Sequence, residues 1–143
     1  VVLEWTNPTC PYVVRHTTAG TMRTLDAAFA DTDVVWLAID STRTVVPADS
    51  AAAREAAQLA YPVLQDPHGT VGRQYGARTT PHMFVIDREG KVRYSGAIDD
   101  DPRGQNATPI NHVDRAVRAV LAGQAPPVSS TEPYGCSVKY EGA

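Results

Sequence analysis

The sequence predicts an α/β fold in three layers, with a central mixed sheet flanked by helices. Short apolar runs alternate along the chain with segments of helical periodicity, as expected for strands and helices that pack against one another. The apolar run at residues 33–40 is typical of a central parallel strand covered on both faces. Two later runs are joined by the polar turn 88–91, which indicates an antiparallel pair and therefore a mixed sheet.

The first elements follow from local signals near the N-terminus. Residues 1–6 form a largely apolar strand. Pro11 suits the first position of a helix at 11–16, because its missing N–H would be unpaired there anyway. The segment 17–20 is expected to interrupt this helix, since β-branched residues and glycine are poor helix formers. Thr21 is the expected N-cap of the next helix.

The later elements continue the alternation. We expect, in order, a strand at 33–40, a helix at 47–60, a strand at 61–66, a short helix at 69–75, a strand at 79–87, its return strand at 92–95, a polar loop at 96–108 and an amphipathic helix at 109–122. Glycines follow the last two helices directly, as is common at helix C-termini.

The chain divides into one domain and a tail. Its 143 residues suit a single domain, which we place at residues 1–123. Residues 124–143 are rich in proline, serine and threonine at first, which favours an extended segment. The aromatic residues Tyr134 and Tyr140 near its end indicate that the tail docks on the domain.

Composition and charge exclude several classes of partner. The net charge is −3 and Lys and Arg form no block, so the chain offers no electrostatic footprint for nucleic acid or an anionic membrane surface. No apolar run approaches the roughly 20 residues that span a bilayer. Cys10 and Cys136 are too few and too far apart for a zinc framework or a disulfide-dense scaffold. The chain opens directly on a strand, so we expect that upstream residues have been removed.

Cys10 is the first candidate for chemistry. It lies at or just before the N-terminus of the helix that Pro11 opens, where unpaired N–H groups and the positive end of the helix dipole stabilise a thiolate. Such a thiol has a lowered pKa and is nucleophilic near neutral pH. The alternative is a small buried apolar cysteine, which is a common role for this residue. The strand–loop–Cys-Pro–helix context favours the reactive thiol.

Three further groups leave alternatives open. Glu4 is expensive to bury in an apolar strand, so it either lies at a solvated edge or sits behind Cys10 and exchanges protons with it. His16 is either a base or ion-pair partner for Cys10 or, as we favour, a solvent-exposed side chain. The three acids at 99–101 lack the spacing of a calcium loop, which favours a solvated loop over a metal site.

Five motifs spread over nearly the whole chain carry a resemblance to a known family. They are Asn-Pro-Thr-Cys-Pro-Tyr-Val at 7–13, Asp-Pro-His-Gly at 66–69, Tyr-Gly-Ala-Arg-Thr-Thr-Pro-His at 75–82, Gly-Ala-Ile-Asp-Asp at 96–100 and Pro-Tyr-Gly-Cys-Ser-Val-Lys-Tyr at 133–140. With this order of elements, the chain resembles the thioredoxin fold. Within that fold it is similar to the redoxin branch, the alkyl hydroperoxide reductase/thiol-specific antioxidant-like proteins. The resemblance implies a redoxin-type insertion and an absent N-terminal hairpin, in a subgroup with a single cysteine in its active-site motif.

The resemblance also implies roles for residues around Cys10. Pro81 is expected to be a cis-proline that faces Cys10, and the Thr80 backbone to pair with an extended thiol substrate. Thioredoxins place a buried acid six residues before the redox cysteine, and Glu4 holds that position here, so proton exchange becomes the favoured role of Glu4. The residues expected to line the substrate groove are Trp5, Pro11, Tyr12 and His82.

Departures from the family patterns limit the chemistry. Val13 stands where a thioredoxin has the second cysteine of Cys-x-x-Cys, so dithiol exchange within the motif is impossible. Leu3 and Asn7 stand where peroxiredoxins have the Pro and the Thr/Ser of Pro-x-x-x-Thr/Ser-x-x-Cys. The hydroxyl that orients peroxide is therefore missing from its usual place, and Thr6 or Thr9 could supply it.

These features predict a thiol–disulfide oxidoreductase or a thiol-dependent peroxidase in which Cys10 is the attacking thiolate. Cys136 is the candidate resolving thiol, because the tail is long enough to cross the domain. The alternative for Cys136 is a structural thiol that holds the tail in place. The expected partners are protein or small-molecule thiols and disulfides, peroxides, and an external thiol reductant. No cofactor is expected.

A second hypothesis comes from another class of protein. The chain would be a redox-inactive binding module that uses the groove around Cys10 and Pro81, and the pKa of Cys10 would then be ordinary, about 8.5. A metal site built from Cys10, His16 and His82 is a weak signal, and none is expected. Because redoxins of this type are often exported in bacteria, a periplasmic location is our expectation.

Overall fold

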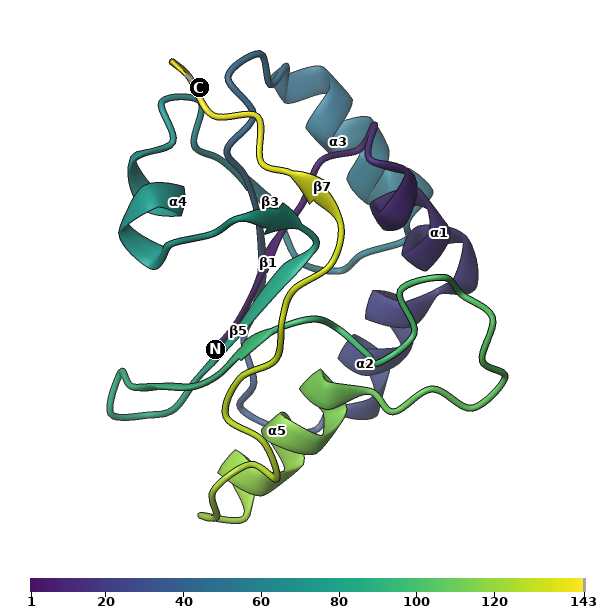
Figure 1. The fold of residues 1–143 in the computed structure, drawn as a ribbon, viewed down its shortest axis with the longest axis vertical. Helices are drawn as coiled ribbons and strands as arrows, with labels where there is room; N and C mark the ends of the chain where they lie inside the picture. The colour runs from purple at the N-terminus through teal and green to yellow at the C-terminus, as the bar shows by residue number, and fades with distance from the viewer. Residues whose placement is uncertain (143) are drawn as a thin grey trace.

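A five-stranded mixed sheet forms the centre of the computed structural model, which describes residues 1–142 (Figure 1). Its strands are β1 (Val2–Trp5), β2 (Trp36–Asp40), β3 (Val63–Gln65), β5 (His82–Ile86) and β6 (Val92–Gly96), in the spatial order β3-β2-β1-β5-β6. The first three run parallel to one another, whereas β5 and β6 are antiparallel to their neighbours. The predicted mixed α/β sheet is therefore confirmed.

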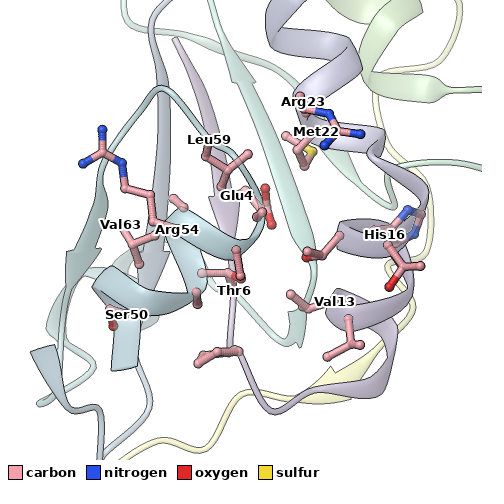
Figure 2. Close-up of a pocket in the computed structure, with 18 of the residues that line it drawn as sticks. Glu4, Thr6, Val13, His16, Met22, Arg23, Ser50, Arg54, Leu59 and Val63 are labelled. Carbon is pink, nitrogen blue, oxygen red and sulfur yellow. The ribbon is translucent and has the colours of Figure 1, made fainter. Parts of the chain in front are cut away.

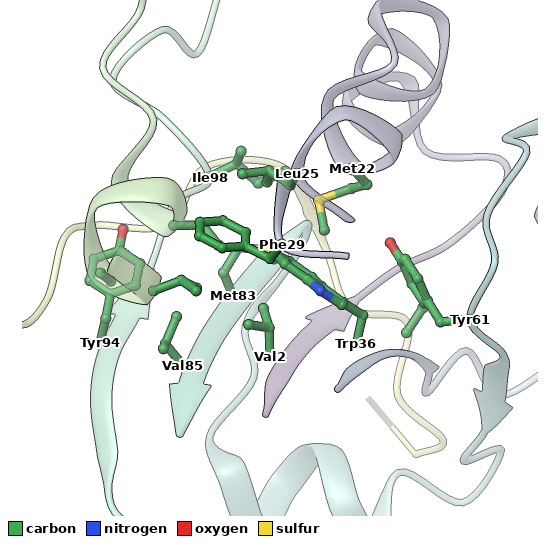
Figure 3. Packing of buried hydrophobic residues seen from close by; sticks show 14 residues of the cluster. Val2, Met22, Leu25, Phe29, Trp36, Tyr61, Met83, Val85, Tyr94 and Ile98 are labelled. Carbon is green, nitrogen blue, oxygen red and sulfur yellow. The ribbon is translucent and has the colours of Figure 1, made fainter. Parts of the chain in front are cut away.

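Helices lie on both faces of this sheet, as predicted. They are α1 (Pro11–Ala19), α2 (Thr21–Ala28), α3 (Pro47–Ala56), α4 (Thr70–Tyr75) and α5 (His112–Leu121). Side chains of α2 and α5 join one buried cluster with Val2 and Val85 of the sheet (Figure 3). The opposite face holds a smaller cluster around Trp5, whose ring packs against Tyr75 at the end of α4.

The alternation of side chains along β1 decides which residues meet which layer. Val2 and Glu4 point to the face covered by α2 and α5, and Leu3 and Trp5 point to the other, because successive strand residues face opposite ways. Glu4 pairs in register with Ala38 of β2 and so lies in the middle of the sheet, not at its edge. The sheet topology thus places an acid inside the domain.

Helix boundaries differ from the predictions where capping overrides propensity. The predicted interruption at 17–20 is wrong, because α1 runs through Thr17 and Thr18 and ends at Ala19. Gly20 adopts a left-handed conformation and donates its N–H to the carbonyls of His16 and Thr17, which closes α1. It is also the N-cap of α2, so Thr21 is the first helical residue rather than the cap.

Two other helices are shorter than predicted. Helix α3 ends at Ala56, four residues before its expected end, and its last turn is closed by a backbone bond from Ala57 to Ala53. Helix α5 begins at His112 instead of residue 109, because the Asn111 side chain accepts the N–H of Asp114 and fixes the first turn there.

The tail crosses the domain and adds a second, two-stranded sheet. In Figure 1 it runs from the end of α5 past the middle of the molecule to α4. There β7 (Cys136–Ser137) pairs antiparallel with β4 (Thr79–Thr80), with Cys136 opposite Thr80. No helix within residues 1–142 is long and apolar enough to cross a membrane.

Candidate functional site around Cys10 and the docked tail

Cys10 is held at the start of α1 by the turn that follows β1. It is the N-cap residue, and Pro11 follows in the first helical turn. Its own N–H donates to the Asn7 carbonyl at 3.0 Å, and the Asn7 side chain accepts from the backbone and hydroxyl of Thr9. The thiol is 2% exposed. The loop therefore places the Cys10 sulfur at the free N–H groups of α1, in a position buried from solvent.

Thr80 is the immediate neighbour of the Cys10 thiol. Cys10 Sγ donates to the Thr80 carbonyl oxygen at 3.1 Å, and the Thr80–Pro81 peptide bond is cis. The Thr80 hydroxyl is buried, and its oxygen has no hydrogen-bond partner among the described residues. A donor is thus available beside the sulfur. Thr9 is turned toward Asn7 instead, and Thr6 lines a cavity behind α1, so neither supplies that donor.

Cys136 reaches the same point from the tail. Its register opposite Thr80 brings it beside Cys10, and both thiols are free. Gly135 makes this approach possible, because a methyl group at its Cα would overlap the Thr80 carbonyl oxygen. Its φ of 151° lies in a region that other residues rarely adopt. The edge that we expected to receive an extended thiol substrate is therefore occupied by the chain's own tail.

The two thiols shift each other's ionisation in opposite directions. Burial is the largest single effect on Cys10 and opposes its ionisation, but hydrogen bonds from the Cys136 thiol, Thr80 and the Val13 and Cys136 N–H groups together outweigh it, so that the pKa of Cys10 is lowered. Burial and the proton shared with Cys10 raise the pKa of Cys136. At a pH where one thiol ionises, Cys10 is the thiolate and Cys136 remains protonated.

Tyr134 anchors the tail on one side of Cys136. Its hydroxyl donates to Asp99 Oδ1 at 2.5 Å, and Arg15 Nη2 donates to it at 3.1 Å. His16 Nε2 lies 2.9 Å from the same oxygen and 3.2 Å from Arg15 Nη2, and His16 Nδ1 is hydrogen-bonded to the Thr21 hydroxyl at 2.9 Å. Burial and the bond to Asp99 raise the pKa of Tyr134, which stays protonated.

Tyr140 anchors the tail on the other side. Its hydroxyl donates to the Ala77 carbonyl at 2.6 Å, and the Arg73 guanidinium lies 4.7 Å from its ring centroid. Gly72 packs directly against the Tyr140 hydroxyl, where a side chain would not fit. Between the anchors, Val138 donates its N–H to the Arg78 carbonyl at 3.0 Å. Cys136 is thus fixed from both directions.

Glu4 lies deep in the domain on the α1 side of the sheet. It is 6% exposed, and its Oε2 atom has no hydrogen-bond partner among residues 1–142. Burial raises the pKa of Glu4 to about 7, against a smaller opposing effect of the nearby Tyr61 hydroxyl. The solvated-edge alternative is wrong. The carboxyl is neutral in part near physiological pH and so is able to exchange a proton.

The expected groove residues do not form one surface. Trp5 is wholly buried, and its Nε1 donates to the Ser41 hydroxyl at 3.0 Å, so it cannot line a groove. Pro11 and Tyr12 are exposed, and the Tyr12 ring lies 5.9 Å from that of Tyr134. His82 is 5% exposed and accepts the Arg78 N–H; burial, with the Arg78 charge, lowers its pKa to about 4.

Other side chains predicted to be solvated are buried in the network beneath the tail. His16 is 6% exposed and contacts Tyr134 and Thr21, so it is neither solvent-exposed nor bonded to Cys10. Asp99 and Asp101 are also buried, and the Asp101 carboxylate accepts two backbone N–H groups of the following loop. Among the described residues, no three His, Cys, Asp or Glu side chains gather as they would around a metal.

The sequence reasoning missed the anchoring network. The sequence does not pair Arg15 or Asp99 with Tyr134, because both are distant from it along the chain. Arg15 is 119 positions from Tyr134, and Asp99 is 35 positions from it. The available signal was weak: an isolated aromatic residue next to Gly135-Cys136, and an acid in a loop that otherwise looked solvated. Nothing in the sequence around Thr80 distinguishes its hydroxyl from that of Thr79.

A helix-terminal cysteine opposite a cis-proline on this mixed sheet defines a thioredoxin-like protein. One similar solved structure is a hypothetical protein from Sinorhizobium meliloti, with 26% identity, a TM-score of 0.87, and coverage of 99% of this chain and 80% of that one. An uncharacterized conserved protein from Geobacillus kaustophilus is also similar, with 26% identity, a TM-score of 0.88, and coverage of 99% of this chain and 77% of that one. The fold is also similar to that of a protein described as thiol:disulfide interchange protein DsbE from Chlorobium tepidum, at 19% identity and a TM-score of 0.59 over 85% of this chain and 77% of that one.

The family assignment rests on the N-terminal two thirds of the chain. The AhpC/TSA family model matches residues 1–95, and the chain belongs to this family. No curated protein matches the chain significantly. The predicted redoxin relationship is therefore confirmed at the level of the family and of the fold.

Proposed function

We propose that this protein is a two-cysteine thiol oxidoreductase in which Cys10 is the attacking thiolate and Cys136 the resolving thiol. The observation that carries the proposal is that both cysteines lie next to the same residue, Thr80. Cys10 Sγ bonds to the Thr80 carbonyl at 3.1 Å, and Cys136 faces Thr80 in the β4–β7 register. A tail held only by packing would not need its cysteine at this point.

Two first steps suit this arrangement. With a hydroperoxide, the Cys10 thiolate attacks the terminal peroxide oxygen and the O–O bond breaks, which leaves a sulfenic acid on Cys10; the departing alkoxide or hydroxide takes up one proton from solvent and leaves as an alcohol or water. With a disulfide, the thiolate attacks one sulfur and releases the other as a thiolate, leaving a mixed disulfide on Cys10. The buried Thr80 hydroxyl supports the thiolate in either case.

Cys136 completes the cycle. Its sulfur displaces water from the sulfenic acid, or the bound thiol from the mixed disulfide, and a Cys10–Cys136 disulfide forms. An external thiol reductant then supplies two electrons and two protons and restores both thiols. Glu4, with its pKa raised to about 7 by burial, is proposed to exchange a proton with the site from behind α1.

The binding-module hypothesis is weaker on two counts. The edge that such a module would offer a partner is covered by β7. The hydrogen bond from Cys136 lowers the pKa of Cys10 against the effect of burial, whereas a module would gain nothing from an activated thiol.

The test is a non-reducing peptide map before and after one equivalent of hydrogen peroxide or of a small aromatic disulfide. We expect free thiols at first and a Cys10–Cys136 disulfide afterwards. Cys10→Ser should abolish turnover, and Cys136→Ser should leave the sulfenic acid or mixed disulfide trapped on Cys10. Full activity of Cys10→Ser would overturn the proposal, and oxidation of Cys10 alone in the wild type would overturn the role of Cys136.

A further inference from the structure

A cavity of about 240 Å³ lies behind Cys10, between the sheet, α1, α2 and α3 (Figure 2). Glu4 and Ala38 form part of its floor, Val13 and Met22 one side, and Ala53 the other. Most of the lining is aliphatic. An apolar cavity of about 150 Å³ is large enough for benzene, so this one has room for a substituted ring.

Two polar groups in this apolar lining lack partners. Glu4 Oε2 and Ser50 Oγ have no hydrogen-bond partner among the described residues, and neither has the Tyr61 hydroxyl, which lies close enough to Glu4 to lower its pKa. Glu4 is 6% exposed and Ser50 is 3% exposed, so both are more than nine-tenths buried. In Figure 2 Glu4 lies near Leu59, with Ser50 and Val13 on opposite sides of the cavity. A buried carboxyl oxygen without a partner is costly, and a bound donor would remove that cost.

The charged residues at the cavity do not neutralise Glu4. Arg54 Nη2 donates to the Ala60 carbonyl at 3.0 Å, and Arg23 donates to the Gln58 side chain. Both guanidinium groups are therefore engaged outside the cavity, and their charge disfavours a cationic ligand. A neutral molecule with a hydroxyl donor matches both the acceptor and the apolar walls.

We propose that this cavity is a binding site for a small, neutral, mostly apolar alcohol or phenol whose hydroxyl donates to Glu4. Helix α3 and its C-cap leave the necessary space because they present the small side chains of Ala53 and Ala57 to the cavity. The Ser50 hydroxyl offers a second polar contact on the same wall. Cys10 does not line the cavity, so binding does not require the thiol and should survive in Cys10→Ser.

The test compares two probes of nearly the same shape, p-cresol and p-xylene, which differ by a hydroxyl in place of a methyl group. Each is titrated into the full-length protein, and binding is followed by amide and methyl NMR shifts of Met22 and Ala53. We expect p-cresol to bind at least tenfold more tightly. Equal affinities would show that the hydroxyl contributes nothing, and no binding of either probe at millimolar concentration would show a cavity that holds only water; either result would overturn the proposal.

Three variants locate the site. Ala53→Leu fills the cavity and should weaken both probes at least tenfold, whereas Ala52→Leu, on the exposed side of α3, should change neither. Glu4→Met keeps the length of the side chain without its acceptor, so the preference for p-cresol should disappear. A preference that persists in Glu4→Met would show that the hydroxyl binds elsewhere and would refute the role of Glu4.

Discussion

The junction that Tyr134 forms with Arg15, His16 and Asp99 and the cavity behind α1 treat buried polar groups in opposite ways. At this junction, His16, Asp99 and Tyr134 are bonded to one another, directly or through the shared phenol oxygen. In the cavity, Glu4 Oε2 and Ser50 Oγ have no partner within residues 1–142. Fully bonded polar networks fix one geometry, whereas an unbonded buried group raises the free energy of the fold.

This difference suggests different purposes. The junction behaves as a structural joint that holds Cys136 beside Cys10. The cavity keeps a carboxyl ready for a proton or a ligand at a cost in stability.

The largest effect is expected from Gly135→Ala. The added methyl group would overlap the Thr80 carbonyl, so β7 must leave β4 and carry Cys136 away. Disulfide formation between Cys10 and Cys136 should slow by at least tenfold in a stopped-flow peroxide assay. Gly142→Ala is the matched control, because its φ is also positive, at 73°, but nothing lies within 4 Å of the added group. Equal rates in the two variants would show that the junction does not position Cys136.

Glu4→Gln should raise the free energy of unfolding at alkaline pH. The folded-state pKa of Glu4, about 7, exceeds its ordinary value of 4.5, so the folded state binds more protons and the wild type loses stability as pH rises between these values. Gln does not titrate. The free energy of unfolding of the variant should therefore exceed that of the wild type by about 3 kcal/mol at pH 8 and by little at pH 4. Urea unfolding at both pH values measures this, and a pH-independent difference would contradict the buried titration.

Tyr134→Phe removes the oxygen at the centre of the junction. Asp99, His16 and Arg15 lose their common partner, and a hydrogen bond to a charged group contributes about 1.5–3 kcal/mol. We expect a loss of this size in the free energy of unfolding, with slower disulfide formation. Tyr12→Phe, an exposed neighbour of the Tyr134 ring, is the control. No change in either measurement would mean that the network does not hold the tail.

Tyr140→Phe should have the smallest effect. It removes one neutral bond to the Ala77 carbonyl, and such bonds contribute about 0.5–1.5 kcal/mol. The ring still packs against Arg73 and Gly72. Disulfide formation should change less than twofold. A larger defect than that of Tyr134→Phe would reverse the ranking of the two anchors.

The sequence alone determined the scaffold. Apolar runs and the hairpin turn predicted the mixed sheet, because strand and helix periodicity are local properties of the chain. Pro11 located the start of α1, and with it the helix-terminal position of Cys10, since proline at that position costs the helix no hydrogen bond. Helix ends were less accurate, because Gly20 and Asn111 act through caps that propensity does not describe.

Only the tertiary structure decided what surrounds the thiol. Strand order buried Glu4 in the middle of the sheet and Trp5 in the opposite core, although each was a single residue in the same apolar run. The tail pairs with Thr80, a residue far from it in sequence. Tyr134 of the tail bonds to Asp99 and His16 and covers them, so these polar side chains are buried although their polarity predicts exposure. Local patterns cannot encode such pairings, because they arise only when the sheet brings distant segments together.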